Sequence, residues 1–296
     1  MIGFEIGYSN LRAVKLDGEH QIVGFNQTIW DTRESLVAQI IDFINRTKEI
    51  FGDFERVGVA VSGIVDRTRN KVLLSRHFAE LSSTDLAAEL KQNCKVEAVL
   101  ENDANAGAWA EYKLGAGIGA QSIFYILLGK GVGGAIICGD KLWRGSAGFA
   151  GEIGHVLVST EENLRVEDVA SYDGILRRIR NRIHQDQTSS LARISEELIT
   201  ITDVVREANN GDDFTQMMLE RTGNYLGVAV AGLINILNTE RIIVGGDIMQ
   251  AGAPILRGMS QTTEQFAFKP SFDSTQIISG SLGEKSVAIG AALLTQ

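Results

Sequence analysis

Short runs of apolar residues broken by turn-forming residues open the chain, and this pattern predicts strands. Three such runs, over residues 2–7, 11–18 and 21–25, indicate a three-stranded meander. Between residues 35 and 51 the apolar positions recur instead at helical spacing, which predicts a helix. The apolar run over residues 57–61 is short enough for a buried strand. The meander is therefore expected to give way to α/β alternation.

The next elements bring polar residues to a strand end. A helix is predicted over residues 84–93, with Ser83 or Thr84 as its N-cap, and a strand over residues 96–100. That strand leads into the sequence Glu101-Asn102-Asp103-Ala104-Asn105. Ligands of open α/β sheets bind at the carboxyl ends of strands, so this cluster is a candidate site.

The second half of the chain repeats the same order of elements. The predicted strands cover residues 122–128, 134–138, 241–244 and 276–278, and the predicted helices cover residues 169–182, 202–209, 214–237 and 284–294. The turn between the first two of these strands is rich in glycine. We predict two α/β lobes: residues 1–115, with the C-terminal helix 284–296 packing back on them, and residues 116–283.

Composition agrees with a globular α/β protein. The 296 residues suffice for two lobes with separate cores, and 32 glycines against 2 prolines suggest tight strand-to-helix turns. A net charge of −9 argues against nucleic-acid binding by this chain, because a duplex-binding surface needs clustered cations. The basic residues closest to such a cluster are expected to form a solvated helix face: Arg177, Arg178, Arg180 and Arg182.

Two cysteines, Cys94 and Cys138, are too few for a disulfide framework. We expect both to be buried reduced thiols, which is typical of a cytoplasmic protein. No signal-peptide pattern opens the chain, and no apolar run reaches the roughly 18 residues that a membrane span requires. Export and membrane insertion are therefore not expected.

A second polar cluster, Gly148-Phe149-Ala150-Gly151-Glu152-Ile153-Gly154-His155, follows the first by about fifty residues. Both clusters place carboxylate, amide or imidazole groups among small residues that let a ligand approach the backbone. A polyhydroxylated ligand needs several such donors and acceptors in fixed positions. Together the clusters indicate a sugar site.

With these residues the chain resembles the ROK family, named for repressors, open reading frames and kinases. The resemblance covers nearly the whole chain, and its most specific further segments are residues 145–155, 233–238, 243–246, 281–283 and 290–292. It implies an α/β protein with the two-lobed, actin-like ATPase (ribonuclease H-like) sugar-kinase fold around a central cleft. It also implies a homodimer.

The resemblance implies roles for individual residues. Asp103 would be the general base that accepts the proton of the sugar's primary hydroxyl as this hydroxyl attacks the γ-phosphate of ATP. Asn102, Glu152, His155 and Glu167 would bind the sugar hydroxyls beside it. The alternative is that Asp103 only ends a strand and that Glu152 and His155 are a surface pair in a loop.

The phosphate-binding turns depart from the family pattern. Kinases of the family begin with Asp-x-Gly-Gly-Thr, whereas this chain has Glu5-Ile6-Gly7-Tyr8-Ser9, so a large ring stands where a close backbone approach is needed. The second turn usually contains Gly-Thr-Gly and here contains Lys130, which could meet a phosphate as a point charge. Alternatively, the Tyr8 ring packs outward and leaves the nucleotide cleft open. If Mg-ATP binds, Mg²⁺ would lie near Glu5, and the nucleotide would contact Glu5, Gly7, Ser9, Lys130, Gly131, Gly133, Gly134, Gly245 and Gly246.

A structural zinc occurs in many relatives, held by the histidine that matches His155 and by three cysteines that follow it. No cysteine follows His155 in this chain, and one histidine without thiolates cannot complete a tetrahedral site. We therefore predict no bound zinc. His20, His77 and His184 have no comparable context and are expected to be ordinary residues.

Two functions remain open. We favour a carbohydrate-binding protein of the family's transcriptional-regulator type, in which the phosphate loops have changed beside an intact sugar cluster. The alternative is an ATP-dependent hexose or amino-sugar kinase with Asp103 as the base. Family repressors carry an N-terminal helix-turn-helix, whereas this chain starts directly with the first predicted strand, which fits the enzyme better. The residue spacing does not identify the sugar.

Overall fold

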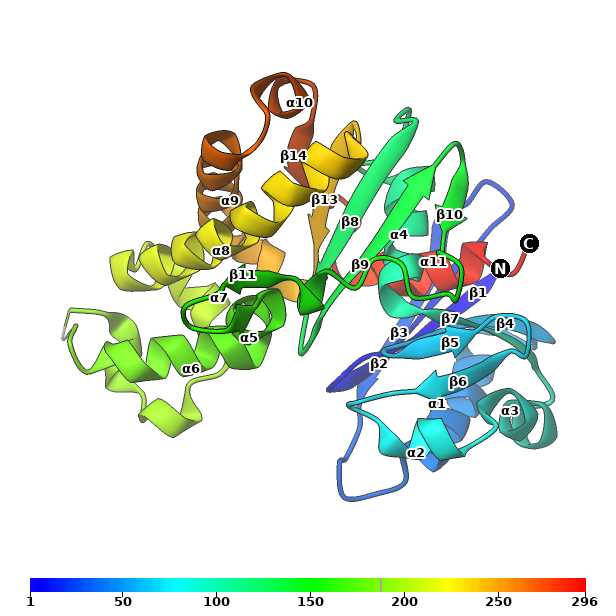
Figure 1. Ribbon diagram of the computed structural model, residues 1–296. Coiled ribbons are helices and arrows are strands. Elements are labelled where there is room, and N and C mark those ends of the chain that lie inside the picture. Colours follow the sequence, from blue (N-terminus) through cyan, green and yellow to red (C-terminus); the bar gives the residue numbers. More distant parts are fainter. Residues whose placement is uncertain (187) are drawn as a thin grey trace. The chain divides into compact units, whose positions relative to one another are not determined.

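The computed structural model describes residues 1–186 and 188–296, and within them the chain forms two compact units (Figure 1). The first unit comprises Met1–Gly115, Leu142–Ala150 and Glu284–Gln296, and the second comprises Ala116–Lys141 and Gly151–Gly283. The predicted second lobe, residues 116–283, included Leu142–Ala150, but in the structure this segment belongs to the first unit. One contact that holds this segment to the first unit is the ion pair of Arg144 with Glu101.

The sheet of the first unit has the strand order β3-β2-β1-β4-β7. Its strands are β1 (Ile2–Ile6), β2 (Asn10–Leu16), β3 (Ile22–Ile29), β4 (Arg56–Val61) and β7 (Glu97–Asn102). The first three pair antiparallel, which confirms the predicted meander, and β1, β4 and β7 pair parallel. The third strand extends to Ile29 because it pairs with β2 along its full length.

The helices of the first unit are α1 (Leu36–Phe51), α2 (Ala79–Ser83), α3 (Leu86–Cys94), α4 (Asp103–Leu114) and α11 (Ser286–Leu293). Ser35 caps α1, since its hydroxyl accepts a hydrogen bond from the Ala38 amide. The predicted caps at residues 83 and 84 are wrong, because Asp85 caps α3 through the Ala88 amide. A short hairpin, β5 (Ile64–Asp66) with β6 (Lys71–Leu74), was not predicted.

Three glycines let α11 lie directly against its neighbours. A β-carbon at Gly290 would collide with the Ala106 carbonyl of α4. Gly3 in β1 and Gly58 in β4 meet the α11 backbone in the same way. The C-terminal helix thus packs on the first sheet and on the helix that starts at Asp103 (Figure 1).

In the second unit, the strands lie in the order β9-β8-β13-β14. These are β8 (Ser122–Leu128), β9 (Val132–Cys138), β13 (Arg241–Gly245) and β14 (Gln276–Ser279), and β10 (Lys141–Trp143) lies where the chain passes to the first unit. Strands β8 and β9 pair antiparallel, and β13 pairs parallel with both β8 and β14. The four predicted strands are therefore confirmed, and β9 starts two residues earlier than expected.

The helices of the second unit are α5 (Val166–Ala170), α6 (Tyr172–Ile183), α7 (Ile201–Asn209), α8 (Asp213–Leu237), α9 (Ala253–Phe266) and α10 (Lys269–Asp273). The predicted helix over residues 169–182 is in fact two helices, because Ser171 leaves helical geometry and caps α6. Helices α9 and α10 were not predicted. Short 3₁₀ turns include η1 (Ile153–His155) and η4 (Asp247–Ala251).

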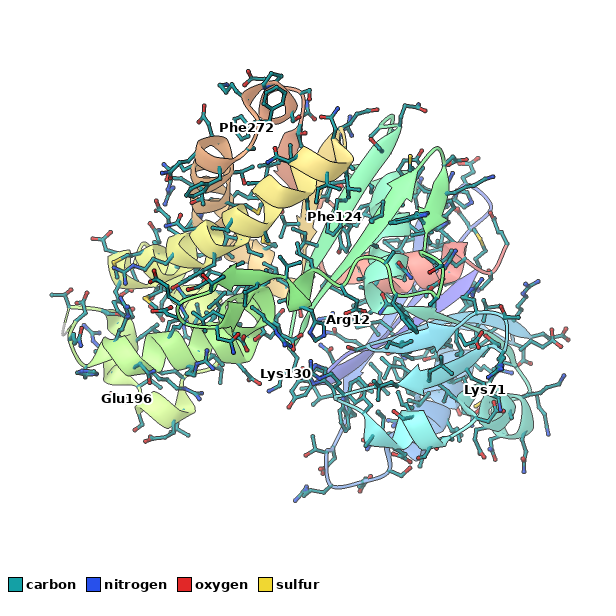
Figure 2. The ribbon with its side chains drawn as sticks, in the orientation of Figure 1. Arg12, Lys71, Phe124, Lys130, Glu196 and Phe272 are labelled. Atoms are coloured by element: carbon teal, nitrogen blue, oxygen red, sulfur yellow. The ribbon has the colours of Figure 1, made fainter. Side chains whose placement is uncertain are left out.

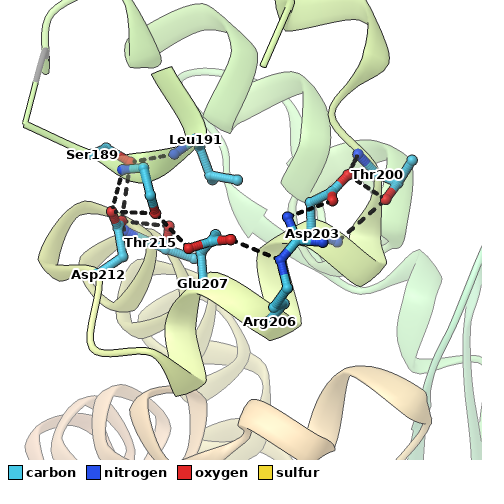
Figure 3. A network of polar contacts seen from close by, with 9 residues as sticks. Ser189, Leu191, Thr200, Asp203, Arg206, Glu207, Asp212 and Thr215 are labelled. Carbon is cyan, nitrogen blue, oxygen red and sulfur yellow. Dashed lines mark hydrogen bonds and ion pairs between the residues drawn. The ribbon is translucent and has the colours of Figure 1, made fainter. Parts of the chain in front are cut away.

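A polar network joins α7 and α8 to the loop before them (Figure 3). The Asp212 carboxylate accepts from the hydroxyl of Thr215 at 2.6 Å and from the amide of Ser190 at 2.8 Å. The Ser190 hydroxyl also donates to Glu207 at 2.6 Å, and Arg206 Nε donates to the same carboxylate at 2.8 Å. These bonds connect the segment that contains Ser190 to the end of α7 and to the start of α8.

Two expectations about side-chain exposure are wrong in part. Cys138 is exposed because it is the last residue of β9, whereas Cys94 is buried and its burial raises the pKa of the thiol. The expected solvated face of α6 holds for Arg177 and Arg182, which are exposed, but not for the other two arginines: Arg178 donates to the Val169 carbonyl at 2.9 Å, and Arg180 to the Ile199 carbonyl at 2.7 Å. Within the part of the chain that the structure describes, no helix meets the length and hydropathy that a membrane span needs.

Candidate functional site

The first polar cluster lies where β7 ends and α4 begins. Asn102 caps α4, since its Oδ1 accepts from the Asn105 amide at 3.0 Å, while its Nδ2 donates to the Gly63 carbonyl and to Asp103 Oδ1, both at 3.0 Å. The same Asp103 oxygen accepts from the Ala104 amide at 2.9 Å. Both side chains are therefore held in fixed orientations at a helix N-terminus, where the dipole favours a carboxylate.

Glu101 supports this cluster from within the protein, with only 2% of its side chain exposed. Its Oε1 accepts from the Asn102 amide at 3.0 Å and from Asn105 Nδ2 at 3.1 Å. Its Oε2 lies 2.6 Å from Arg144 Nη2 and 3.6 Å from Arg67 Nε. Burial lowers the pKa of Arg67, and the Glu101 carboxylate opposes that shift. The carboxylate thus ties the start of α4 to the segment Leu142–Ala150.

The turn between β1 and β2 carries the first predicted nucleotide residues. The Gly7 amide donates to the Asn10 carbonyl at 2.9 Å, which closes a tight turn with Ser9 exposed at its tip. Glu5 pairs across the strands with Arg12, and Arg12 Nη1 lies 3.4 Å from both Glu5 carboxylate oxygens. The exposed fractions of these side chains are 12% and 6%, and Arg12 is labelled in Figure 2. The Glu5 carboxylate is therefore already paired with a buried cation.

Tyr8 follows Gly7 in this turn and is 45% exposed. Its ring meets the ring of His77 edge-on, with centroids 5.9 Å apart. The turn is also held from the other side, because Trp30 Nε1 donates to the Gly7 carbonyl at 3.2 Å. His77 thus has a specific contact that the sequence did not reveal.

The part of the second polar cluster that belongs to the second unit, Gly151–His155, packs on β9. A β-carbon at Gly151, whose φ is +98°, would collide with the Gly134 carbonyl, and one at Gly154 would collide with the Val132 carbonyl. These glycines let η1 lie against the strand. Glu152 caps η1, and His155 is its last residue. Glu152 Oε2 and His155 Nε2 are 3.9 Å apart, and both side chains are about half exposed.

Glu167 lies on α5, close to the same strand. Its Oε2 accepts from the Val132 amide at 3.2 Å, so β9 connects Glu167 with the cluster that contains Glu152. The last carbonyls of α5 accept from arginines on α6: Arg177 donates to Asp168 at 2.7 Å and Arg178 to Val169 at 2.9 Å. Burial lowers the pKa of Arg178 to about 10, so this side chain keeps its charge at neutral pH.

The glycine turn between β8 and β9 contains Lys130, labelled in Figure 2, whose Nζ lies 2.7 Å from Asp173 on α6. The same turn contacts the start of α6, because the Tyr172 amide donates to the Gly129 carbonyl at 2.8 Å. Gly131 ends the turn, and Gly133 and Gly134 lie in β9. The ammonium of this turn is therefore paired with a carboxylate.

The remaining predicted nucleotide residues, Gly245 and Gly246, lie at the end of β13 and directly after it. Gly245 ends this strand, where a β-carbon would meet the Tyr125 hydroxyl. Gly246 has a φ of +111° and lies against the Leu128 carbonyl at the end of β8. Both positions require glycine, which brings an open backbone to the carboxyl ends of two neighbouring parallel strands.

Each unit thus gathers its own share of the predicted residues. In the first unit, Asn102 and Asp103 are directly hydrogen-bonded, and Glu5 lies in β1 just before the turn that contains Gly7 and Ser9. In the second unit, the predicted sugar residues Glu152, His155 and Glu167 lie close to β9, and Lys130 precedes that strand. Among residues 1–186 and 188–296, no group of three or more His, Cys, Asp or Glu side chains is arranged to hold a metal ion.

Two arginines that form ion pairs near these residues were not predicted from the sequence. Arg12 could have been found, because a turn over residues 7–10 sets Glu5 opposite Arg12 in the hairpin. Arg144 had no local signal, since it lies 43 residues from Glu101 in the chain. A basic residue in a glycine-rich loop is usually exposed, and only the fold shows its carboxylate partner.

Comparisons with known proteins agree with these features. A family model described as the ROK family matches residues 1–296. Glucokinase of Halalkalibacterium halodurans is 33% identical over 256 residues, which cover 82% of this chain and 77% of that protein. The xylose repressor of Caldicellulosiruptor bescii is 26% identical over 98% of this chain and 76% of its own length. The sequence is thus similar to both enzymes and repressors.

Among solved structures, a ROK family glucokinase from Streptomyces griseus, in complex with glucose and AMPPNP, is 28% identical in sequence. The comparison covers 100% of this chain and 98% of that chain, with a TM-score of 0.89. This similarity confirms the predicted fold class, the α/β two-lobed actin-like sugar-kinase fold.

Proposed function

The chain belongs to the ROK family, and from this premise we propose that it is a sugar-binding protein of the regulator type that lacks efficient kinase activity. Its ligand is a monosaccharide. The residues proposed to bind its hydroxyls are Asn102, Asp103, Glu152, His155 and Glu167. Support comes from the bonds that fix Asn102 and Asp103 at the start of α4, since fixed donors and acceptors bind a sugar without a large loss of side-chain entropy.

The buried ion pair of Glu5 with Arg12 is the observation that carries the regulator assignment. Mg²⁺ binds through free carboxylates and substrate phosphates, and it needs near-octahedral oxygen ligands. Glu5 is the acidic residue of the first phosphate turn, and the guanidinium of Arg12 lies 3.4 Å from both of its oxygens. A magnesium ion near Glu5 would have to compete with this buried cation.

The second phosphate turn supports the same proposal. Lys130 replaces a hydroxyl residue of the family pattern, and its ammonium is paired with Asp173 at 2.7 Å. A phosphate approaching this turn would have to weaken that pair. Both turns therefore carry charge arrangements that are satisfied without a nucleotide.

A kinase is the second candidate, and the similarity to glucokinases supports it. The glucokinase of H. halodurans is 33% identical, and the S. griseus glucokinase, with glucose and AMPPNP bound, is similar along 98% of its chain. In this proposal Mg-ATP is the phosphate donor and Asp103 is the general base. The oriented carboxylate could both position the attacking hydroxyl and accept its proton.

One experiment separates the two proposals. ADP release from Mg-ATP would be measured with a panel of hexoses, pentoses and N-acetylated sugars, and the melting temperature would be measured with the same sugars. Sugar-induced stabilisation without ADP release is the result expected for a regulator-type protein. Sugar-dependent ADP release that Asp103→Asn abolishes would establish the kinase instead. If no sugar raises the melting temperature or releases ADP, the sugar site itself is wrong.

A further inference from the structure

Arg165 contacts the imidazole of His155 within the second unit. The distance from Arg165 Nη1 to His155 Nδ1 is 3.4 Å. The two residues are ten positions apart, and a small hairpin of β11 (Leu157–Ser159) and β12 (Leu164–Arg165) brings them together. Arg165 pairs with Leu157, and the Val166 amide donates to the Val156 carbonyl at 2.9 Å. The backbone therefore holds both side chains on one end of the hairpin.

Arg165 is itself fixed at the start of α5. Its amide donates to Asp168 Oδ2 at 2.8 Å, which forms one half of a capping box. The C-terminal carbonyls of the same helix accept from Arg177 and Arg178. The backbone of Arg165 is thus anchored by the helix that follows it, and its side chain reaches back to the ring.

The chemistry of the two groups decides which of them donates. A guanidinium has only N–H donors, so Nδ1 of His155 must be the acceptor in this contact. A neutral imidazole carries one proton, and when Nδ1 accepts, that proton is on Nε2. Because Nδ1 accepts a hydrogen bond from Arg165, Nε2 carries the proton and can donate a hydrogen bond to a ligand. Nε2 faces Glu152, whose Oε2 is 3.9 Å away.

We propose that Arg165 is a positioning residue that holds His155 in the Nε2–H form, so that the ring presents a hydrogen-bond donor beside the Glu152 carboxylate. This donor and this acceptor match a sugar hydroxyl, which both donates and accepts. They would also match two neighbouring hydroxyls. The sugar part of the inference rests on the proposed function. The assignment of the ring proton does not, because it concerns the protein alone.

The ring proton can be observed directly. Long-range ¹H–¹⁵N spectra of the imidazole, recorded on the full chain at about pH 8.5 where imidazoles are generally neutral, distinguish the two tautomers. The His155 signals are assigned by their loss in His155→Gln. We expect the Nε2–H form in the wild type and a shift toward a mixture in Arg165→Gln.

Arg177→Gln is the matched control. Arg177 also bonds α5, through the Asp168 carbonyl, and no contact joins it to His155 among the described bonds. This variant should keep the wild-type tautomer, which separates an effect on the ring from a general loosening of the helix. An Nδ1–H form in the wild type, or an unchanged tautomer in Arg165→Gln, overturns the inference.

Sugar titrations of the same variants test the second part. Where a sugar stabilises the wild type, Arg165→Gln should bind it about fivefold to tenfold more weakly, as expected for one misdirected hydrogen bond, and Arg177→Gln should bind it normally. Equal affinity in Arg165→Gln would overturn the role in sugar binding. If no sugar binds the wild type but the tautomer responds to Arg165→Gln, the proposed function fails while the assignment of the ring proton stands.

Discussion

Arg144 Nη2 lies 2.6 Å from Oε2 of Glu101, a carboxylate with only 2% of its side chain exposed. The two residues come from segments that are far apart in the chain. Glu101 precedes Asn102 and Asp103, whereas Arg144 begins the glycine-rich loop that leads to Glu152. The pair therefore anchors this loop to the strand end that carries the proposed catalytic residue.

The coupling between Glu101 and Arg144 can be measured by a double-mutant cycle. Glu101→Gln and Arg144→Met should each lower the free energy of unfolding by about 1–3 kcal/mol, because the first leaves Arg144 without its carboxylate and the second leaves buried Glu101 with only the more distant Arg67. The double variant should lose clearly less than the sum of the two single losses. Urea denaturation of the four proteins gives these values, and strictly additive losses would show that the pair contributes nothing.

Replacing two helical glycines by alanine should change the stability of the protein in opposite directions. Gly290→Ala in α11 places a methyl group against the Ala106 carbonyl, and we expect a loss of about 3 kcal/mol or more, or failure to fold. Gly232→Ala in α8 meets no atom within 4 Å and should stabilise by up to about 1 kcal/mol, because alanine is the better helix former. Thermal melts of both variants test this, and similar values would refute the packing of α11 on α4.

Removing the Arg12 side chain should allow the Glu5 carboxylate to bind Mg²⁺. In Arg12→Met the Glu5 carboxylate has lost its closest cation, so we expect Mg²⁺ to raise the melting temperature of this variant but not of the wild type. Lys130→Met is the control, since it removes a cation of the second phosphate turn and leaves Glu5 paired. If Mg²⁺ raises the melting temperature of the wild type by the same amount, the proposal that Arg12 keeps Mg²⁺ from Glu5 is wrong.

Acid stability should depend on the network of Asp212 and Glu207 (Figure 3). The Ser190 hydroxyl, followed by Arg206, lowers the pKa of Glu207. Burial acts to raise the pKa of Asp212, but hydrogen bonds from Thr215 and Ser190 together lower it.

Because these folded-state pKa values lie below the ordinary values of 4.5 and 3.8, the stabilisation is complete above those values and is lost as the pH falls through the folded-state values. Melting temperatures measured between about pH 6 and pH 2.5 should therefore fall less steeply in Asp212→Asn than in the wild type. Parallel curves would show that Asp212 does not contribute.

Zinc should be absent from the purified protein. His155 contacts Arg165 and Glu152, and no thiolate follows it in the sequence to complete a tetrahedral site. Elemental analysis after purification without chelators gives the metal content directly. One equivalent of zinc per chain would contradict this prediction.

The sequence predicted most of the local structure because local structure depends on short-range patterns. The helical spacing of the apolar positions in α1 and the strand predicted over residues 96–100, which is β7 in the structure, could both be recognised from neighbouring residues. The predictions failed where tertiary contacts override the local pattern. Ser171 divides a continuous helical pattern, and Arg178 lies in a helix that looked solvated but bonds to a buried carbonyl.

By itself, the sequence determined the family, the order of the main strands and of most helices, and the two polar clusters, since each is encoded in residues that are close together in the chain. The tertiary structure decided the partners: Arg12 for Glu5, Arg144 for Glu101 and Arg165 for His155. The physical reason is that a long arginine side chain can reach many carboxylates or rings. Strand register and loop closure select one of them, and neither is visible in a local pattern.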